Sequence, residues 1–142
     1  MQTKLALAYD DAAEVMKAAR AEALANGWSV GIAVVDDGGH LVAFERMDGC
    51  APIGAYIALE KARSAALGRR DTKVYEDMVN GGRFAFVGAP QITPLEGGVL
   101  IKVGEEVVGA VGVSGVKPDQ DTRVAKAGSN ALHASKSYQV AG

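Results

Sequence analysis

The pattern of apolar and polar residues divides the chain into helical and extended segments. Apolar residues recur at three- and four-residue spacing over residues 4–26, which predicts an amphipathic helix that ends at Asn26-Gly27. Residues 29–36 and 40–47 alternate instead about an Asp-Asp-Gly-Gly turn, so they are predicted to form a β-hairpin. Both faces of the first of these strands are mostly apolar, which indicates that other layers cover the sheet on both sides.

The rest of the chain continues this alternation. Pro52 is predicted to open a second helix that runs to about residue 67, because proline suits the first helical turn. A short helix, two strands and a last helix are expected at residues 71–80, 99–103, 106–114 and 118–136. The segment between the short helix and the next strand is mostly irregular, and its residues 84–88 are the candidate for a fifth strand.

This order of elements predicts an α+β fold, with an antiparallel sheet flanked by helices in a three-layer α/β/α arrangement. Ala110, Gly112 and Ser114 form a surface without bulk on the last strand, so a helix backbone or a flat ligand is expected to approach it closely. Packing against this strand is also the expected reason for Gly128 in the last helix. No repeat or linker interrupts the pattern, and residues 1–142 are predicted to form one domain.

Composition excludes several classes of protein. Lys and Arg number 15 and Asp and Glu 17, without a basic run, which argues against binding to nucleic acid. No apolar stretch approaches the roughly 20 residues that span a bilayer, and the N-terminus lacks the regions of a secretory signal. The chain is therefore expected to be cytoplasmic, without a membrane partner. Cys50 is the single cysteine, which excludes an internal disulfide and suits a small buried thiol.

Charged residues near the hairpin and on the second helix are candidates for a site. Arg46 and Asp48 share a face if the strand continues, and an arginine can bind a carboxylate bidentately. The alternative is a structural ion pair between them. Lys61 lies on an apolar helical stripe, so it is expected either to contact substrate or to pair with Asp36, Asp48 or Glu96.

A glycine pair supplies the second group of candidates. Glu96 precedes Gly97 and Gly98, whose amides can form an anion-binding concavity, and the carboxylate could act as a general base. The alternative is a β-turn with a solvated glutamate. The catalytic candidates are therefore Glu96, Lys61 and Asp48, and the ligand-binding candidates are Arg46, Gly97, Gly98, His40 and Ser114.

Other kinds of site find little support in the sequence. His40 is expected to be an exposed hairpin residue, and with Met47 and Cys50 it matches axial haem ligands only by residue type. No HxxxH, CxxC or HxH spacing occurs, so no metal site is predicted. The glycines at 109, 112 and 115 lie in a strand rather than between a strand and a helix, which excludes a dinucleotide fingerprint.

Four stretches of the chain resemble the GlcG/HbpS family, also called the haem-degrading or PduO C-terminal-like domain. They are Val34-Val-Asp-Asp-Gly-Gly-His-Leu-Val-Ala-Phe-Glu-Arg-Met-Asp-Gly-Cys-Ala51, Ala58-Leu-Glu-Lys-Ala-Arg-Ser-Ala65, Leu95-Glu-Gly-Gly-Val-Leu-Ile101 and Val108-Gly-Ala-Val-Gly-Val-Ser-Gly115, the last followed by Asp119 and Asp121. They occur in the family's order and cover nearly the whole chain. The chain differs in Leu100, where many members have proline, and in a first helix without histidine.

The resemblance implies a profilin-like fold with a five-stranded antiparallel sheet. It also implies homo-oligomers, commonly dimers assembled into octamers. Its best-described members bind haem, and some degrade or sense it, whereas others lie among catabolic enzymes. For this chain it implies haem as a cofactor, with Arg46 and Lys61 as natural partners of the propionates.

Three functions remain open from the sequence. The first is an oligomeric haem- or tetrapyrrole-binding protein that degrades or senses haem. The second is a small cofactor-independent catabolic enzyme, a lyase, isomerase or hydrolase, for an acidic or aromatic metabolite. In that enzyme Arg46 would hold the substrate carboxylate, and Glu96 or Asp48 would move a proton. The third is an assembly module without chemistry of its own, which the abundant Ala and Gly surfaces favour.

Overall fold

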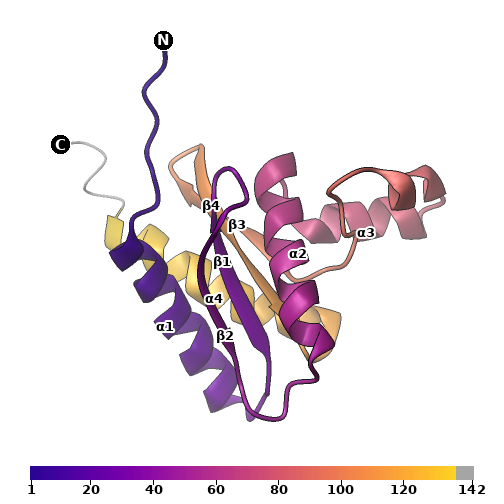
Figure 1. Ribbon diagram of the computed structural model, residues 1–142, viewed down its shortest axis with the longest axis horizontal. Coiled ribbons are helices and arrows are strands. Elements are labelled where there is room, and N and C mark those ends of the chain that lie inside the picture. Colours follow the sequence, from indigo (N-terminus) through magenta and orange to yellow (C-terminus); the bar gives the residue numbers. More distant parts are fainter. Residues whose placement is uncertain (137–142) are drawn as a thin grey trace.

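A four-stranded antiparallel sheet lies between two layers of helices in the computed structural model, which describes residues 1–136 and side chains as far as residue 132 (Figure 1). The strand order is β2-β1-β4-β3. Helices α1 and α4 cover one face of the sheet, and α2 covers the other. The elements are α1 (Tyr9–Ala25), β1 (Gly31–Asp36), β2 (Leu41–Arg46), α2 (Ile53–Gly68), α3 (Thr72–Asn80), η1 (Phe84–Gly88), β3 (Gly98–Val103), β4 (Glu106–Ser114) and α4 (Pro118–Lys136).

Successive side chains of β1 point to opposite faces of the sheet and pack into two separate apolar clusters, as the sequence predicts. Ile32 and Val34 join the larger core beneath α1 and α4, whereas Ala33 and Val35 join a smaller cluster beneath α2. The smaller cluster consists mainly of alanines, so α2 approaches the sheet closely. Helices thus cover both faces of the antiparallel sheet, which confirms the predicted α+β arrangement.

Glycine permits two close helix contacts. A side chain at Gly112 would collide with the backbone oxygen of Ala58 on α2, which confirms a helix rather than a ligand over the small-residue strand. Gly128 has a different role from the one predicted. A Cβ atom there would lie 2.9 Å from the carbonyl oxygen of Val15, so this glycine lets α4 pack against α1 and not against the strand.

The first helix begins later than the apolar pattern predicts. Residues 4–8 match its spacing but are extended, and α1 starts at Tyr9. The carboxylate of Asp11 accepts a hydrogen bond from the backbone N–H of Ala8 at 2.8 Å, which fixes the start of the helix there. Lys4 and Leu5 bond instead to side chains of the body, so the N-terminal segment lies against the sheet's turns.

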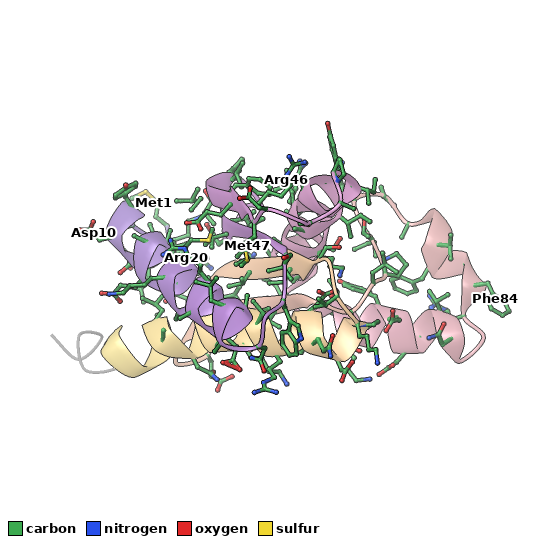
Figure 2. All side chains as sticks on the ribbon, turned by 90° about the horizontal axis from the view of Figure 1, so that it is seen from below. Met1, Asp10, Arg20, Arg46, Met47 and Phe84 are labelled. Carbon is green, nitrogen blue, oxygen red and sulfur yellow. The ribbon has the colours of Figure 1, made fainter. Side chains whose placement is uncertain are left out.

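The predicted fifth strand is wrong for the residues that the structure describes. Residues 84–88 form the 3₁₀ helix η1, which packs with α3 in an arm that projects from the body (Figure 1). The Tyr75 and Phe86 rings, with centroids 5.6 Å apart, join the two parts of the arm. Phe84 lies exposed at its outer end, far from Arg46 (Figure 2).

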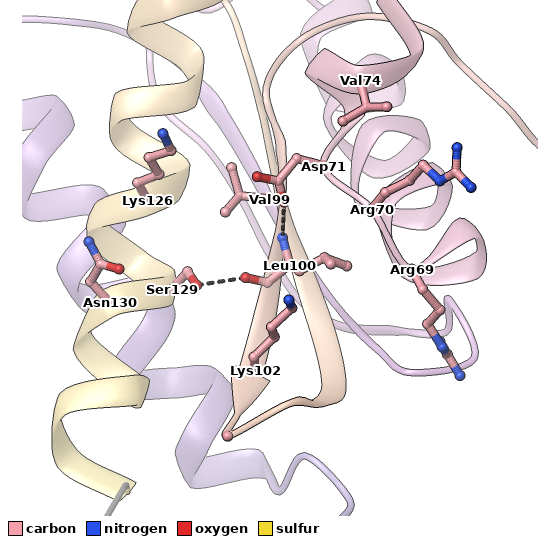
Figure 3. Close-up of a pocket in the computed structure, with 11 residues that line it drawn as sticks. Arg69, Arg70, Asp71, Val74, Val99, Leu100, Lys102, Lys126, Ser129 and Asn130 are labelled. Atoms are coloured by element: carbon pink, nitrogen blue, oxygen red, sulfur yellow. Dashed lines mark hydrogen bonds between the residues drawn. The ribbon is translucent and has the colours of Figure 1, made fainter.

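Side chains occupy the outer edge of β3, which explains why no further strand pairs there. The N–H of Leu100 donates to Asp71 Oδ1 at 2.9 Å, and its carbonyl accepts from Ser129 Oγ at 2.7 Å (Figure 3). The N–H of Gly98, two residues earlier on the same edge, donates to Thr72 Oγ1 at 2.8 Å. Groups that a fifth strand would need are therefore already bonded.

Candidate functional site

Three of the four strands bring candidate residues to one end of the sheet. Arg46 pairs with Gly31, which pairs on its other side with Ser114, and β3 begins nearby at Gly98. His40 follows the hairpin turn at the opposite end, separated by the length of β1. The structure therefore does not gather all the predicted residues into one cleft.

Lys61 forms a buried ion pair that the sequence did not identify. Its Nζ lies 3.0 Å from Asp121 Oδ2 and donates to the carbonyl of Val113 at 2.9 Å. The predicted partners, Asp36, Asp48 and Glu96, are wrong, because the true partner lies on α4. With only 4% of Lys61 exposed, the pair links α2, β4 and α4 beneath the surface, and its predicted catalytic role stays a prediction.

Burial disfavours the charged form of the Asp121 carboxylate, and its bonded partners offset part of this effect. Burial raises its pKa above the ordinary range, while the charge and hydrogen bond of Lys61 lower it. Its other oxygen accepts the backbone N–H of Val116 at 3.1 Å. Both oxygens are therefore bonded, as a buried charge requires.

The diglycine segment packs directly on this pair. The carbonyl of Gly97 accepts the N–H of Val113 at 3.0 Å, and a Cβ atom at Gly97 would lie only 2.8 Å from Lys61 Nζ. Gly97 also has a φ of +130°, a conformation that favours glycine. A side chain at Gly98 would collide with the carbonyl of Lys61. Close packing thus accounts for both glycines, and their predicted role in anion binding stays a prediction.

Glu96 lies at the surface above the buried pair. Its Oε2 accepts a hydrogen bond from Thr122 Oγ1 at 2.8 Å, so the half-buried carboxylate is held in place rather than freely solvated. Glu96 also lines a cavity of about 530 Å³ beside α4, with Lys73, Arg123 and Lys126 on the same walls. Glu22 and Asp119 also line this cavity, so acidic and basic groups are balanced there and Glu96 does not face a cationic pocket.

Arg46 and Asp48 are exposed and stand apart from the diglycine group. Arg46 lies two strands away from Ser114, on the face of the sheet that α2 covers. No ion pair joins Arg46 to Asp48 in the part of the chain that the structure describes. Ser114 is buried, with its carbonyl 3.8 Å from the thiol of Cys50, whose predicted burial is confirmed.

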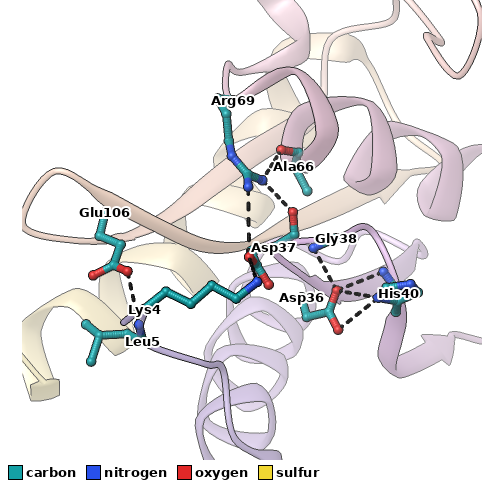
Figure 4. A network of polar contacts seen from close by, with 9 residues as sticks. All are labelled: Lys4, Leu5, Asp36, Asp37, Gly38, His40, Ala66, Arg69 and Glu106. Carbon is teal, nitrogen blue, oxygen red and sulfur yellow. Dashed lines mark hydrogen bonds and ion pairs between the residues drawn. The ribbon is translucent and has the colours of Figure 1, made fainter. Parts of the chain in front are cut away.

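His40 forms a pair with a carboxylate four residues earlier. Its Nδ1 lies 3.1 Å from Asp36 Oδ1, and the same oxygen accepts the backbone N–H groups of Gly38 and His40 (Figure 4). The imidazole is otherwise exposed, as predicted. The sequence does contain a signal for this contact. Asp36 ends a strand just before a glycine-containing turn, and an aspartate at such a position often accepts a hydrogen bond from the backbone two residues further on.

The described residues offer neither a metal cage nor a membrane span. Through residue 132, no three His, Cys, Asp or Glu side chains are grouped so that they could hold a metal ion. No helix within residues 1–136 is long and apolar enough to cross a membrane. The side chain of His133, the other histidine, lies outside the described residues.

Known proteins share both the sequence and this fold. Protein GlcG of Escherichia coli K12 is 60% identical over 114 residues, which cover 80% of this chain and 85% of that protein. Klebsiella pneumoniae ORFY superposes with a TM-score of 0.89 at 28% identity, covering 94% of this chain and 95% of that one. A double mutant of Streptomyces reticuli HbpS gives a TM-score of 0.85 at 26% identity, covering 93% of this chain and 90% of that one.

The family comparison agrees with these relatives. Residues 7–130 match the family described as "Haem degrading protein HbpS-like", from just before α1 to the fourth turn of α4. The match includes the hairpin, the diglycine segment and the Lys61–Asp121 pair, which are the features described above. The chain therefore belongs to the HbpS-like family.

Proposed function

We propose that this protein is a homo-oligomeric haem- or tetrapyrrole-binding protein that degrades or senses haem. Its membership of a family described as haem-degrading supports the choice of ligand. The observation that carries the proposal is the Asp36–His40 pair on the exposed turn between β1 and β2. Haem bound there would supply a redox-active iron whose chemistry the protein sets through its axial ligand.

The geometry of His40 fits an axial ligand. A histidine that binds iron usually donates its other ring N–H to a carboxylate, which fixes the tautomer and the ring orientation. Nδ1 of His40 lies 3.1 Å from Asp36 Oδ1, so a proton on Nδ1 leaves the lone pair on Nε2. The imidazole side chain is 81% exposed, and Nε2 is therefore accessible to a ligand.

An exposed apolar surface adjoins this histidine and suits the flat face of a tetrapyrrole. We define the β2 surface as Leu41, Phe44 and Leu67, large apolar side chains that are all exposed. Leu41 directly follows His40, and Leu67 lies next to Gly39 of the same turn. Arg46 continues the face of Phe44, where its guanidinium can bind a propionate.

The larger cavities among the described residues do not suit an enclosed haem. Three of them, of about 390, 520 and 530 Å³, are lined by no His, Cys, Met or Tyr side chain, the types that ligate haem iron. A fourth is lined by Tyr9 and Met16 but measures only about 240 Å³, which is below the usual range of small-molecule sites. The β2 surface, by contrast, lies on an edge strand, and in the described part of the chain no strand pairs with its outer side. Two copies that meet there would cover the ligand, and the proposed oligomer therefore belongs to the proposed function.

Titration with hemin tests the proposal. We expect a Soret shift that saturates at stoichiometric hemin, and a changed spectrum with weaker binding in His40→Ala. His133→Ala is the matched control, because it removes the only other histidine of the chain. Arg46→Gln should weaken binding while leaving the Soret position unchanged, since it removes a propionate contact and not the axial ligand. An unshifted Soret band, or identical spectra for wild type and His40→Ala, would overturn the proposal.

A further inference from the structure

A second binding site is suggested by the cleft along the outer edge of β3. This β3 cleft has a volume of about 520 Å³, within the range of small-molecule sites, and lies between α4 and the segment that joins α2 to α3. Lys126 and Arg70 stand on opposite sides of it, with Leu100 and Lys102 between them (Figure 3). It contains none of the residues proposed above to bind haem.

Positive charge is concentrated in this cleft although the chain as a whole is slightly acidic. Four of its lining residues are cationic, Arg69, Arg70, Lys102 and Lys126, and one is acidic, Asp71. The whole chain has 15 cationic and 17 acidic residues, so the cleft departs from the average surface. A concave surface of one sign concentrates ligands of the opposite charge.

Some of these cations have no strong competitor for a ligand. The guanidinium of Arg70 lies 5.6 Å from the Tyr75 ring, and within the described residues neither Arg70 nor Lys126 donates a hydrogen bond. Arg69, in contrast, already bonds the carbonyls of Asp37 and Ala66. Arg70 and Lys126 are therefore the available cations, one on each side.

The floor between them is the outer edge of β3, where polar and apolar surface are about equal and Leu100 has no unmet backbone groups. Val99 and Leu100 pack into the two cores, and Val74 is exposed beside them. Asp71 and Ser129 bond the N–H and carbonyl of Leu100, so these groups need no ligand. The same hydrogen bond directs the carboxylate of Asp71 toward β3. Cations on two sides of one cleft are the complement of a ligand that carries two carboxylates.

We propose that the β3 cleft binds a small organic dicarboxylate. In the structure the guanidinium of Arg70 points away from Leu100 and lies 5.6 Å from the Tyr75 ring (Figure 3). It turns into the cleft to bind one carboxylate with its planar fork, and Lys126 binds the other as a point charge. The spacer between the two carboxylates crosses the outer edge of β3 at Leu100. A single monocarboxylate cannot engage both sides, so two charged groups are the basis of selectivity.

Calorimetric titration at constant ionic strength tests this site with malonate, glutarate and pimelate, which differ in spacer length. We expect saturable binding of at least one of them, and binding at least about tenfold weaker in Arg70→Gln and in Lys126→Gln. Lys17→Gln removes an exposed lysine of α1 and is the matched control, with unchanged affinity expected. Backbone amide shifts on titration should be largest at residues 99–102.

Three results would overturn the proposal: no saturable binding of any of the three acids, equal affinity in Arg70→Gln and wild type, or equal affinity for butyrate and glutarate. The hemin titration is independent of this outcome. His40→Ala should leave dicarboxylate binding unchanged, and Lys126→Gln should leave the Soret spectrum unchanged, so either proposal can fail alone.

Discussion

The Nζ atom of Lys61 lies 3.0 Å from Oδ2 of Asp121, a residue 60 positions further along the chain. Both side chains are almost fully buried, at 5% and 4% exposure. The lysine also bonds the carbonyl of Val113, and the aspartate bonds the N–H of Val116, so the pair fastens both sides of the β4–α4 connection. This contact holds the helices of the two layers to one strand end.

Removing the cation of this pair should destabilise the protein strongly. In Lys61→Met the carboxylate of Asp121 would be buried without its partner, and breaking a buried pair costs about 3–5 kcal/mol. Urea unfolding at pH 7 would measure the loss, with exposed Lys17→Met as the control. The double variant Lys61→Met/Asp121→Leu should recover part of the stability, because both charges are then absent. A double variant no more stable than Lys61→Met would contradict this account.

The loss in Lys61→Met should also depend on pH. Burial already raises the pKa of Asp121, and without Lys61 nothing of comparable strength lowers it. The folded state then binds a proton more tightly than the unfolded state, so stability rises as pH falls through the raised pKa. Unfolding free energies between pH 5 and pH 8 should therefore converge toward wild type at the acidic end. A constant difference across this range would contradict the prediction.

Gly112→Ala should destabilise the protein through a backbone collision. A Cβ atom at this position would overlap the carbonyl oxygen of Ala58 and the N–H of Ala62, which are rigid parts of α2. Overpacking of this kind costs about 1–3 kcal/mol or more. Gly88→Ala is the control, since a Cβ there meets nothing within 4 Å. Thermal melting should show a lower midpoint for the first variant and little change for the second.

Acid should weaken the link between α1 and β2. Arg20 donates two hydrogen bonds to Glu45, at 2.8 and 2.6 Å, and these lower the pKa of that carboxyl. A lowered pKa gives stability that is complete above the unfolded value of about 4.3 and is lost as pH falls through the folded value. Because both side chains are well exposed, the contribution is modest, at most about 1 kcal/mol.

Comparison of wild type with Glu45→Gln over pH 3 to 7 measures this link. The difference in unfolding free energy should be constant above pH 6 and shrink below pH 4.5, because the variant has no carboxylate to protonate. The exposed Glu105→Gln, in the turn between β3 and β4, is the control for a general change in charge. A difference that stays the same at every pH would show that the ion pair contributes nothing.

Assembly should depend on the β2 surface. Phe44→Glu places a charge among its apolar side chains, so we expect a smaller particle by analytical ultracentrifugation. Phe84→Glu is the matched control, because Phe84 is also exposed but lies on the α3–η1 arm. An unchanged mass for Phe44→Glu would contradict the proposed interface. A lower mass for Phe84→Glu alone would place the contact between copies on the arm instead.

Elements whose signal is local could be predicted from the sequence. The hairpin follows from the Asp-Asp-Gly-Gly turn, and the close approach of α2 follows from Ala110 and Gly112 on β4. The start of α1 was placed too early because Leu5 and Tyr9 fit the helical spacing, whereas the cap from Asp11 decides the boundary. Periodicity reports which side chains are apolar and not where backbone hydrogen bonds begin.

Contacts between distant segments could not be predicted in the same way. Lys61 was recognised as a lysine that needs a partner, but nothing in its neighbourhood points to Asp121 on another helix. The β3 cleft is also invisible in sequence, since its cations come from separate elements. The prediction of a fifth strand was wrong for a related reason. Asp71 and Ser129, which come from other parts of the chain, bond the edge of β3 that this strand would have used.

The two edge strands of the sheet differ in whether their outer backbone groups are already bonded, and this difference limits how two copies can join. Hydroxyl and carboxylate groups of Thr72, Asp71 and Ser129 bond the outer edge of β3 at Gly98 and Leu100, so within the described residues the edge open to a further strand is that of β2. An edge that can pair once, with a second copy of itself, forms a closed two-fold contact and cannot propagate into a ribbon. If two copies join through β2 as proposed, further growth would use the helices or the arm, because Asp71, Thr72 and Ser129 already bond the other edge.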